Sequence, residues 1–276
     1  MFELPEYIVL ADQINEFMSG KRIRSGELGN SPHKFVWYNR TPEEFSELTE
    51  GKCIGTASAK GRWLSVSTEP GYMLLFGECG GKMLLHTPGS PMPKKYHLYL
   101  SFEDDSFFTM TTQMWGAMEL YEKGEEQNRE YVKDMRTTPI ESEFTFEYFD
   151  ALIDELATRK KRSVKGLLTQ EQLIPGLGNA IAQDILFQAK VHPRHAINDL
   201  GKEQRLAIYG AIIESVREVI DNGGRYDEYD LHNRRGGYVR KMDKRSTGNP
   251  CPDCGTVIMK IQYLGGACYL CPSCQE

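Results

Sequence analysis

The sequence predicts an α+β protein of several domains, in which an N-terminal helix and a β-sandwich precede a helical domain and a small C-terminal β-hairpin. Short apolar runs separated by Gly, Pro and Asn occupy residues 21–112, a pattern typical of a sandwich or barrel. Helical periodicity follows from residue 146, and two CxxC pairs close the chain. With 276 residues, 40% of them hydrophobic, the chain has enough apolar material for more than one core.

The predicted N-terminal domain covers residues 1–125 and begins with an amphipathic helix at residues 3–18. Pro5 falls in the first turn of this helix, where proline is tolerated. The expected strands follow at residues 34–38, 63–66, 73–76, 82–86, 96–102 and 106–110. The remaining predicted divisions are a linker at residues 126–141, a helical domain at 142–242 and a hairpin module at 243–276.

A Pro-Gly-x-Gly turn within residues 173–179 (LIPGLGN) joins two of the expected helices. Gly176 and Gly178 can both take positive φ, and Asn179 stands where a helix N-cap belongs. The backbone N–H groups of Gly178, Asn179 and Ala180 are then expected at the positive end of a helix, which is an anion-binding position. A phosphate site and a tight turn without a ligand both stay open, whereas a dinucleotide fingerprint is not indicated because no strand precedes the glycines.

Four of the seven cysteines form a CxxC…CxxC pattern at Cys251, Cys254, Cys271 and Cys274. Each pair offers two thiolates to one ion, so the two pairs together predict one structural, tetrahedral zinc site. A catalytic zinc is not expected, because four cysteines leave no coordination position open, and two disulfides fit a cytosolic chain poorly. The cysteines without metal-like spacing are expected to be ordinary thiols: Cys53, Cys79 and Cys268.

The charge of the chain is distributed unevenly. Its formal net charge is −6, and residues 1–150 hold 15 basic and 24 acidic side chains, whereas residues 151–276 have an excess of three basic ones. Basic clusters within residues 159–165 and 234–245 either bind a phosphate backbone or form solvated surfaces. The chain shows neither a run of 18 apolar residues nor a signal-peptide pattern. The expected location is therefore the cytoplasm, at the nucleoid if the protein is bacterial, without a membrane partner.

The order of these motifs resembles the formamidopyrimidine-DNA glycosylase/endonuclease VIII family. Residues 1–6 (MFELPE) are similar to that family's opening, Met-Pro-Glu-Leu-Pro-Glu. Lys165 together with residues 174–179 (IPGLGN) resembles its helix–two-turn–helix segment, and residues 251–275 resemble its zinc finger. The resemblance covers the chain end to end, and it implies a β-sandwich and a helical domain that flank a DNA cleft.

The resemblance also implies a chemistry. In the family, an N-terminal amine attacks C1′ of a damaged nucleotide that has left the duplex stack, a Schiff base forms and the strand is cleaved. An α-amine suits this step, because its ordinary pKa of about 7.7–8.0 leaves an unprotonated fraction near neutral pH. By resemblance, Met1 or Phe2 provides the amine and Glu3 acts as general acid/base at the sugar. The implied phosphate contacts are Lys165, Gly178 and Asn179.

Four positions depart from the family's pattern. Phe2 stands in place of the nucleophilic proline, and because removal of an initiator Met generally needs a small second residue, Met1 is expected to stay. Arg62 replaces a phosphate-binding lysine, which keeps the charge but changes the donor geometry. Residues 111–116 (TTQMWG) replace Asp-Pro-Arg-Arg-Phe-Gly, so Met114 and Trp115 are the expected apolar wedges in DNA. Residues 265–267 replace the arginine of the finger hairpin.

Two functions from different classes follow. The first is a DNA-repair enzyme, a glycosylase with AP-lyase activity, that binds double-stranded DNA with a damaged base or abasic site as a monomer. The second is a protein that has lost catalysis and recognises damaged or distorted DNA. An unrelated zinc-ribbon protein is the third alternative. Apart from the resemblance, Glu3 is also explained as favourable charge at a helix N-terminus, and Trp115 as core packing.

Overall fold

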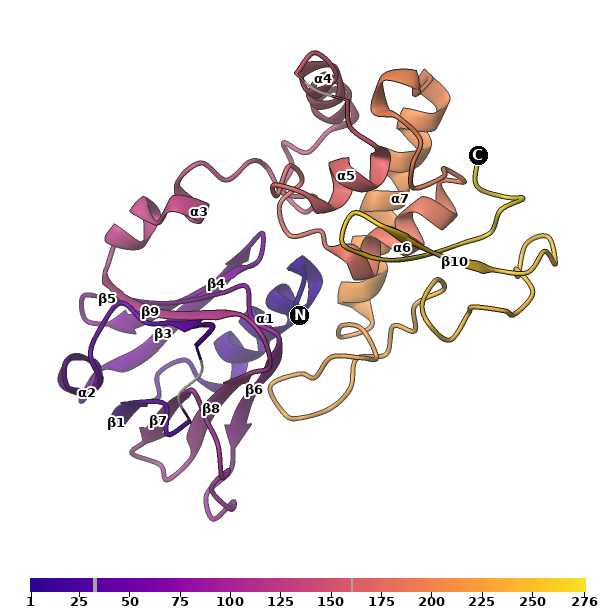
Figure 1. The fold of residues 1–276 in the computed structure, drawn as a ribbon. Helices are drawn as coiled ribbons and strands as arrows, with labels where there is room; N and C mark the ends of the chain where they lie inside the picture. The colour runs from indigo at the N-terminus through magenta and orange to yellow at the C-terminus, as the bar shows by residue number, and fades with distance from the viewer. Residues whose placement is uncertain (32–33, 160) are drawn as a thin grey trace. The chain divides into compact units, whose positions relative to one another are not determined.

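The computed structural model describes residues 1–31, 34–159 and 161–276. The chain forms two compact units: residues Met1–Met135 with Ile220–Tyr238, and residues Arg136–Val219 with Val239–Glu276. The first unit is rich in strands, and the second consists of helices and a C-terminal hairpin (Figure 1). Lys160, part of the predicted basic cluster, lies outside the described residues. No helix in the described part of the chain is both long and apolar enough to cross a membrane.

Helix α1 (Leu4–Phe17) opens the first unit and confirms the amphipathic helix that the sequence predicts. Glu3 is its N-cap, and the backbone N–H of Glu3 donates to the carboxylate of Glu6 at 2.9 Å as part of a capping box. One face of the helix is buried in the core of the sandwich through Tyr7, Leu10, Ala11 and Ile14. The helix therefore fixes the N-terminus of the chain against the strands.

Two sheets form the first unit. Among the described residues, one has five strands in the order β2-β9-β5-β4-β3, and the other has four in the order β1-β7-β8-β6. Neighbouring strands are antiparallel, except that β2 and β9 are parallel. The strands are β1 (Ile23–Leu28), β2 (Val36–Trp37), β3 (Cys53–Lys60), β4 (Trp63–Glu69), β5 (Tyr72–Gly77), β6 (Gly81–His86), β7 (Leu98–Phe102), β8 (Phe107–Thr112) and β9 (Gly116–Glu122).

Apolar side chains from both sheets meet in one core. Leu64 and Phe76 come from the five-stranded sheet, and Leu100 and Phe108 from the four-stranded sheet. The rings of Phe76 and Phe108 lie 6.2 Å apart between centroids. The sheets therefore pack face to face, and the predicted β-sandwich is confirmed.

Several elements of this unit were not predicted from the sequence: β1, β3, β9 and α2 (Pro42–Thr49). The β3 sequence CIGTASAK consists largely of small residues, and GAMELYE in β9 includes helix formers, so neither has a strong strand pattern. Both are strands because they pair with β4 and β5, respectively. Helix α2 begins with a capping box of Thr41 and Glu44 that is visible in the sequence.

The segment predicted as a linker contains short helical turns. These are the 3₁₀ helix η1 (Glu125–Asn128) and the one-turn helix α3 (Glu130–Lys133). Arg129, between them, forms a bidentate ion pair with Glu119 on β9, with N–O distances of 3.1 and 3.2 Å. This contact holds the start of α3 against the five-stranded sheet.

The second unit has a helical centre that confirms the predicted helix–turn–helix segment. It comprises α4 (Phe146–Ala157), α5 (Val164–Thr169), α6 (Asn179–Gln188), the 3₁₀ helix η2 (Ile197–Asp199) and α7 (Lys202–Asp221). Ser163 caps α5 by accepting a hydrogen bond from the Gly166 N–H. The N-cap of α6 is Gly178, so the prediction of Asn179 as N-cap is wrong by one residue. Gly176 turns the chain between α5 and α6 with a φ of 91°.

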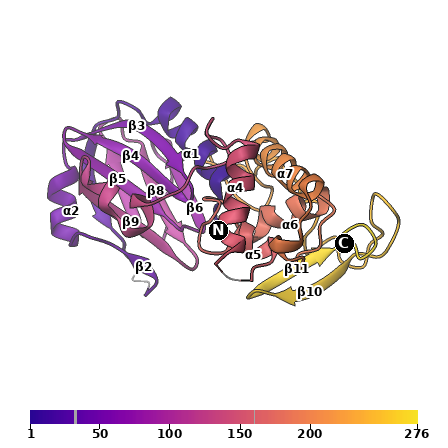
Figure 2. The ribbon, with the colours of Figure 1, turned by 90° about the horizontal axis from the view of Figure 1, so that it is seen from above.

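The C-terminal hairpin pairs β10 (Met259–Tyr263) with β11 (Gly266–Leu270) and lies beside α6 (Figure 2). Leu264 and Gly265 both have positive φ, as a two-residue type I′ turn requires. Gln183 on α6 donates to the Ala267 carbonyl at 2.7 Å and accepts from the Tyr269 N–H at 2.8 Å. These two hydrogen bonds attach the hairpin to the helix.

Residues 220–238, which comprise the last two residues of α7 and the segment after it, pack with the first unit. Gln13 on α1 accepts a hydrogen bond from the Leu231 N–H at 2.9 Å and donates to Asp230 at 3.0 Å. The Leu85 N–H on β6 donates to the Leu231 carbonyl at 2.9 Å. The segment therefore supplies side chains to the region around the N-terminus. The domain boundaries drawn from composition stay a prediction.

Candidate functional site

The N-terminus of the chain is held with its amine exposed. The Met1 amine pairs with the Glu228 carboxylate at 3.0 Å. The next backbone N–H, of Phe2, donates to the Cys79 carbonyl at 2.8 Å, and the Phe2 ring is fully buried, edge-on to Tyr7. A side chain at Gly80 would not fit, since its Cβ would lie 2.9 Å from the Met1 Cα. The structure thus presents the amine of residue 1 and buries the backbone nitrogen of residue 2.

Three carboxylates surround the buried guanidinium of Arg225. Their shortest N–O distances to it are 3.7 Å for Glu3, 2.7 Å for Glu6 and 3.6 Å for Glu228. Arg225 Nη2 also donates to the Met1 carbonyl oxygen at 2.9 Å. One cation therefore connects the N-terminal residue with the three acids.

Electrostatics favour the charged forms in this cluster. Burial by itself disfavours the Arg225 cation, but the facing carboxylates outweigh burial and raise the pKa of Arg225 above its ordinary value. Burial likewise opposes ionisation of Glu6, yet the Arg225 charge and hydrogen bonds lower the pKa of Glu6 below its usual range. Glu6 and Arg225 therefore form a buried ion pair beside the exposed amine.

Sequence reasoning found Glu3 but missed Glu6, Arg225 and Glu228. Glu6 belongs to the opening motif and could have been found there. Glu228 lies 227 positions from Met1, and no motif marks either it or Arg225. The glycines just before Arg225 indicate only a turn, which the positive φ angles of residues 223 and 224 confirm. These two side chains reach the site through tertiary packing alone.

Arg62, a predicted phosphate ligand, lies in the turn between β3 and β4. Its Nη1 donates to the Glu78 carboxylate at 3.0 Å and lies 3.9 Å from the Met1 sulfur. The fold thus brings Arg62 close to Met1, where the Arg62 guanidinium is paired with the Glu78 carboxylate.

The predicted wedges, Met114 and Trp115, lie between β8 and β9 on the same unit. Met114 is 61% exposed and Trp115 is 39% exposed, so Trp115 is not a core residue. The Trp115 ring stacks on Trp37, with 5.3 Å between centroids and 10° between planes. Both wedge candidates are therefore accessible to a ligand.

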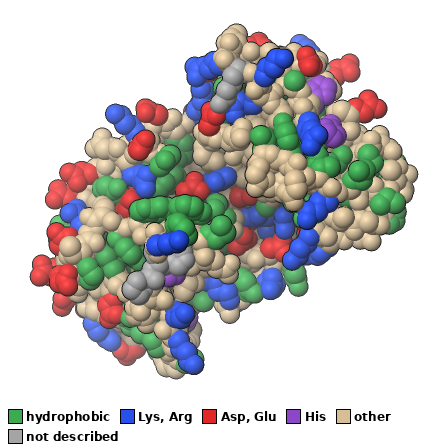
Figure 3. Space-filling model, in the orientation of Figure 1, with side chains coloured by type: hydrophobic (Ala, Val, Ile, Leu, Met, Phe, Trp, Pro, Cys, Tyr) green, Lys and Arg blue, Asp and Glu red, His purple; other side chains and the backbone are tan. Residues whose placement is uncertain are grey.

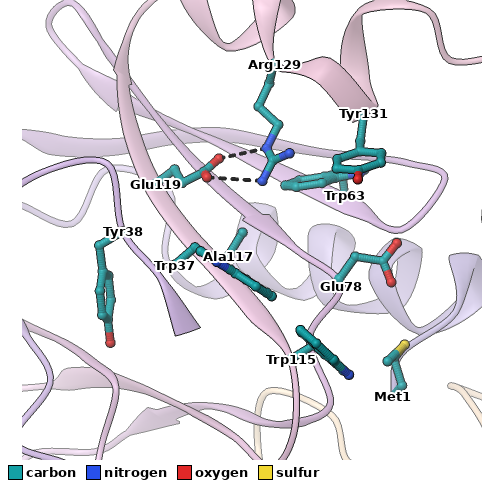
Figure 4. A pocket seen from close by; sticks show the side chains of 10 residues that line it. All are labelled: Met1, Trp37, Tyr38, Trp63, Glu78, Trp115, Ala117, Glu119, Arg129 and Tyr131. Carbon is teal, nitrogen blue, oxygen red and sulfur yellow. Dashed lines mark hydrogen bonds and ion pairs between the residues drawn. The ribbon is translucent and has the colours of Figure 1, made fainter. Parts of the chain in front are cut away.

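A pocket of about 770 Å³ opens beside Met1 (Figure 4). Its aromatic lining comes from β2 and the residue after it, from β4, from the turn before β9 and from α3, namely Trp37, Tyr38, Trp63, Trp115 and Tyr131. Glu78, Glu119 and Arg129 contribute polar groups. The volume lies within the range of about 300–1,000 Å³ that is usual for small-ligand sites.

The other predicted phosphate ligands are in the second unit, at the C-terminal hairpin. Lys165 is only 2% exposed, and its Nζ donates to the Tyr263 carbonyl at 2.6 Å. Asn179 is exposed, and its amide donates to the Ala267 carbonyl at 3.3 Å. Gly178 is buried at the start of α6. The fold brings these three residues together around the tip of the hairpin.

The four predicted metal ligands converge at the base of the hairpin module. The sulfur atoms of Cys251, Cys254, Cys271 and Cys274 all lie within 4.8 Å of one another. The Cys251–Cys274 and Cys254–Cys271 sulfur pairs are 3.8 and 3.4 Å apart. Four thiol groups at this spacing can bind one metal ion.

Comparison with known proteins assigns the family. The model of the formamidopyrimidine-DNA glycosylase N-terminal domain matches residues 1–138, and that of the H2TH domain matches residues 136–228. The formamidopyrimidine-DNA glycosylase of Bacillus licheniformis is 28% identical over 280 residues, with 100% of both chains covered. That of Bacillus cereus strain ZK is 26% identical over 279 residues, which is 100% of this chain and 99% of the relative.

Solved structures agree with this assignment. The Lactococcus lactis Fpg in complex with DNA containing an abasic site has a TM-score of 0.86 and 26% identity, with 99% of each chain covered. The complex of the same protein with DNA containing an oxidized pyrimidine has a TM-score of 0.85, also at 26% identity and 99% coverage of each chain. This protein therefore belongs to the formamidopyrimidine-DNA glycosylase family.

Proposed function

We propose that the protein is a DNA-repair enzyme, a DNA glycosylase with AP-lyase activity, that acts on double-stranded DNA with a damaged base or an abasic site. The observation that carries the proposal is the exposed Met1 amine, which lies 3.0 Å from Glu228, on a residue whose carbonyl oxygen is bound by Arg225, the same arginine that faces Glu3. Membership of the family over residues 1–228 supports it. So do the solved relatives, whose structures contain abasic-site and oxidized-pyrimidine DNA.

In the proposed reaction the Met1 amine loses a proton to Glu228 and attacks C1′ of the damaged nucleotide. The N–C1′ bond forms and the bond to the base breaks, and the leaving base takes up the proton that Glu228 accepted from the amine. The attached amine then loses a second proton to Glu3, and Glu3 donates this proton to the sugar oxygen as the ring opens to the Schiff base. At an abasic site the same amine adds to the aldehyde carbon, and water leaves. Arg225 holds the Met1 carbonyl and both acids in place.

We assign the nucleophile to Met1 instead of Phe2. The Phe2 N–H is engaged by the Cys79 carbonyl, and its ring is buried in the core. A chain that began at Phe2 would place its amine at this buried position, away from Glu228. Since misplacement of a reacting group by about 1 Å can cost roughly 10²-fold in rate, retention of Met1 is part of the proposal.

The proposed DNA contacts are those derived from the family resemblance. Arg62, Lys165, Gly178 and Asn179 would hold phosphates, and Met114 and Trp115 would enter the base stack. Support for the wedges is their exposure, 61% and 39%. We further propose that the protein acts as a monomer in the cytoplasm and that the domains end near residues 125 and 242, with a linker at 126–141.

We propose that the four cysteines bind one structural zinc ion. Zinc–sulfur bonds of about 2.3 Å in a tetrahedron place sulfur atoms roughly 3.8 Å apart. The sulfur–sulfur distances of 3.8 and 3.4 Å support this fit. Because four thiolates leave no open position, the ion would stabilise the hairpin and take no part in catalysis.

The test is borohydride trapping on a duplex that carries one abasic site. Borohydride reduces a Schiff base to a stable amine, so an adduct that maps to Met1 supports the proposed reaction. Intact mass of the protein shows whether Met1 is present. The Glu3→Gln variant is expected to trap more slowly than the wild type, because the general acid is lost. An adduct on a lysine side chain, or on none, would overturn the N-terminal mechanism.

DNA recognition without catalysis is the second candidate. It is favoured by the ion pair between the Met1 amine and Glu228, which engages the amine as an ammonium group. Tight binding to abasic DNA without an adduct would support this function in place of the first.

A further inference from the structure

The proposed reaction uses the backbone amine of Met1 and leaves its thioether without a role. The Met1 side chain is part of the lining of the aromatic pocket, and all residues that line this pocket belong to the first unit. Met1 is 43% exposed. Figure 3 shows hydrophobic side chains in contact with solvent over the strand-rich part of the molecule, among acidic and basic ones. A small dissolved molecule can therefore reach the Met1 sulfur.

Exposure distinguishes Met1 from the methionines of the core. The buried ones are at most 2% exposed, and they are Met18, Met83, Met110, Met118 and Met242. Three others are exposed to a similar extent as Met1, namely Met92, Met114 and Met259. Oxidation of a thioether needs contact with the oxidant, so the exposed group is the one open to it. Within this group, Met1 is the residue that carries the proposed nucleophile.

The surroundings of the Met1 sulfur include a cation. Arg62 Nη1 lies 3.9 Å from this sulfur and 3.0 Å from a carboxylate oxygen of Glu78. A thioether sulfur is only a weak hydrogen-bond acceptor, so the contact with sulfur is weak. Figure 4 shows Met1 and Glu78 at the same end of the pocket. A stronger acceptor on the Met1 side chain would thus lie beside an N–H donor that is already in place.

Oxidation supplies such an acceptor. A hydroperoxide transfers one oxygen atom to sulfur: the S–O bond forms, the O–O bond breaks, and sulfur loses the two electrons that the peroxide gains. The proton of the transferred oxygen moves to the leaving oxygen, which departs as water when the oxidant is hydrogen peroxide. The product is a sulfoxide, a polar and chiral group in place of a flexible apolar one. Its oxygen carries partial negative charge and competes with Glu78 for the Arg62 guanidinium.

The Met1 backbone has little freedom to move away from this new contact. Its amine is paired with Glu228, and its carbonyl oxygen accepts a hydrogen bond from Arg225. Gly80 packs so closely that a Cβ there would lie 2.9 Å from the Met1 Cα and 3.4 Å from the Met1 Cβ. The enlarged side chain is therefore directed toward Arg62 and the open pocket. The added oxygen occupies space next to the reacting nitrogen and changes how the sugar can approach it.

We propose that the Met1 thioether is an oxidation site, at which a hydroperoxide forms a sulfoxide that binds Arg62 and slows attack by the Met1 amine. The inference rests on the proposed function, since the loss is measured in the Schiff-base step. Sulfoxide reductases return methionine sulfoxide to methionine, so the modification is reversible. The protein would then react with abasic DNA more slowly under oxidising conditions and recover on reduction.

The test compares the wild type with Met1→Leu, which is made by cleaving an N-terminal fusion partner directly before residue 1. Leucine keeps the α-amine and nearly the volume of the side chain but has no sulfur. Each protein is treated with hydrogen peroxide or left untreated. Peptide mass spectrometry locates the added oxygen, with the buried Met83 as the internal control.

The rate of borohydride trapping on an abasic duplex is then measured for every form. DNA is present above the dissociation constant of each form for DNA that carries tetrahydrofuran, a stable abasic analogue, so that changes in affinity do not enter the rate. The quantity compared is the ratio of the treated to the untreated rate within one protein.

We expect the N-terminal peptide of the wild type to gain one oxygen atom. The trapping ratio of the wild type should fall roughly ten-fold, within the roughly 10²-fold that displacement of a reacting group by about 1 Å can cost. The ratio of Met1→Leu should stay near one, although Met92, Met114 and Met259 are oxidised in both proteins. Methionine sulfoxide reductase should restore the wild-type rate. In Arg62→Leu, the sulfoxide has no guanidinium to bind, so the fall should be clearly smaller.

Three results would each overturn the proposal. The first is an N-terminal peptide without added oxygen at a peroxide dose that oxidises Met114. The second is an equal fall in the wild type and Met1→Leu, and the third is a fall in Arg62→Leu as large as in the wild type. Failure of the proposed function is separate, since it appears as absent trapping by the untreated wild type, whereas oxidation is read from the peptide masses.

Discussion

Glu228 contacts the Met1 amine, which is the nucleophile of the proposed reaction. Replacement by Gln keeps the shape of the side chain but removes the charge that holds the Met1 ammonium and accepts its proton. We expect the rate of Schiff-base trapping in Glu228→Gln to fall by about 10²-fold, because general-base assistance is worth at least this much. Affinity for tetrahydrofuran-containing DNA should change little. Glu103→Gln, an exposed acid of the same unit, is the control. Trapping at the wild-type rate in Glu228→Gln would exclude this acid from the mechanism.

Glu6 makes the stability of the first unit depend on pH. Its pKa is lowered in the folded protein, so ionised Glu6 stabilises the fold above its unfolded pKa, about 4.3, and this contribution is lost as the pH falls through the lower, folded value. Glu6→Gln leaves Arg225 with a weaker partner and should cost about 3–5 kcal/mol at neutral pH. The variant should also lose part of the fall in melting temperature between about pH 5 and pH 3.

Thermal unfolding followed by circular dichroism measures both effects, with the exposed Glu16→Gln on the same helix as the control. A variant whose melting temperature falls with acid as steeply as that of the wild type would show that another group dominates the dependence.

The residues of the site differ in how far the sequence reveals them. Glu3 stands in a recognisable opening, and the four cysteines have a spacing that only a metal site explains well. Arg225 and Glu228 belong to no recognisable motif or spacing. Their role depends on contacts with Met1, which lies more than two hundred positions away in the sequence. The sequence predicts Asn179 as the N-cap of α6, whereas the N-cap is Gly178, a difference of one residue that is usual at helix ends.

At the level of elements, the local sequence pattern does not predict every strand, and some strands form because a neighbouring strand pairs with them. The small residues of β3 and the helix formers of β9 become strands because β4 and β5 offer them partners. Residues 220–238 illustrate the same limit, since nothing in their composition indicates that they return to the first unit. Elements with strong local periodicity, such as α1 and α7, were found from sequence because their apolar faces repeat at helical spacing.

The end of β5 is an element at which one methyl group should disturb the pocket. A Cβ at Gly77 would lie 2.1 Å from the Trp63 ring, which supports Arg129. We expect Gly77→Ala to destabilise the protein by about 1–3 kcal/mol through overpacking. Gly210→Ala is the matched control: apart from adjacent residues and the backbone of α7 itself, no atom lies within 4 Å of a Cβ there, and alanine in the middle of α7 should stabilise by about 0.5–1 kcal/mol. Chemical denaturation measures both, and equal effects of the two changes would contradict the packing argument.

The C-terminal hairpin is the element that should depend on metal. Its core is small and includes Cys251 and Cys271, so removal of the ion should unfold it while the β-sandwich stays intact. A chromogenic chelator is expected to release one zinc ion per chain, with loss of affinity for DNA. Cys271→Ser should release zinc at lower chelator concentration than the wild type, and Cys53→Ser, which lacks metal-like spacing, should not. Release of no metal from the wild type would contradict the zinc proposal.

On the scale of the whole molecule, the net charge of −6 is the sum of an acidic N-terminal part and a basic C-terminal part. The first 150 residues carry most of the acids, whereas residues 151–276 have a basic excess. Affinity for DNA therefore depends on a few placed cations and not on the average charge. Two proposed phosphate ligands differ in their surroundings. Arg62 forms an ion pair with Glu78, whereas Lys165 donates a hydrogen bond to the Tyr263 carbonyl of the hairpin.

The salt dependence of DNA affinity tests these two cations together. Each neutralised phosphate contributes about −0.9 to the slope of log affinity against log salt on duplex DNA. We expect Arg62→Met and Lys165→Met each to reduce the steepness by about 0.9, and the exposed Lys123→Met, paired with Glu69, to leave it unchanged. A Lys165→Met protein that binds more weakly at an unaltered slope would mean that Lys165 acts only by holding Tyr263 and the hairpin. The same result for Arg62→Met would confine Arg62 to its contact with Glu78 and remove it from the DNA interface.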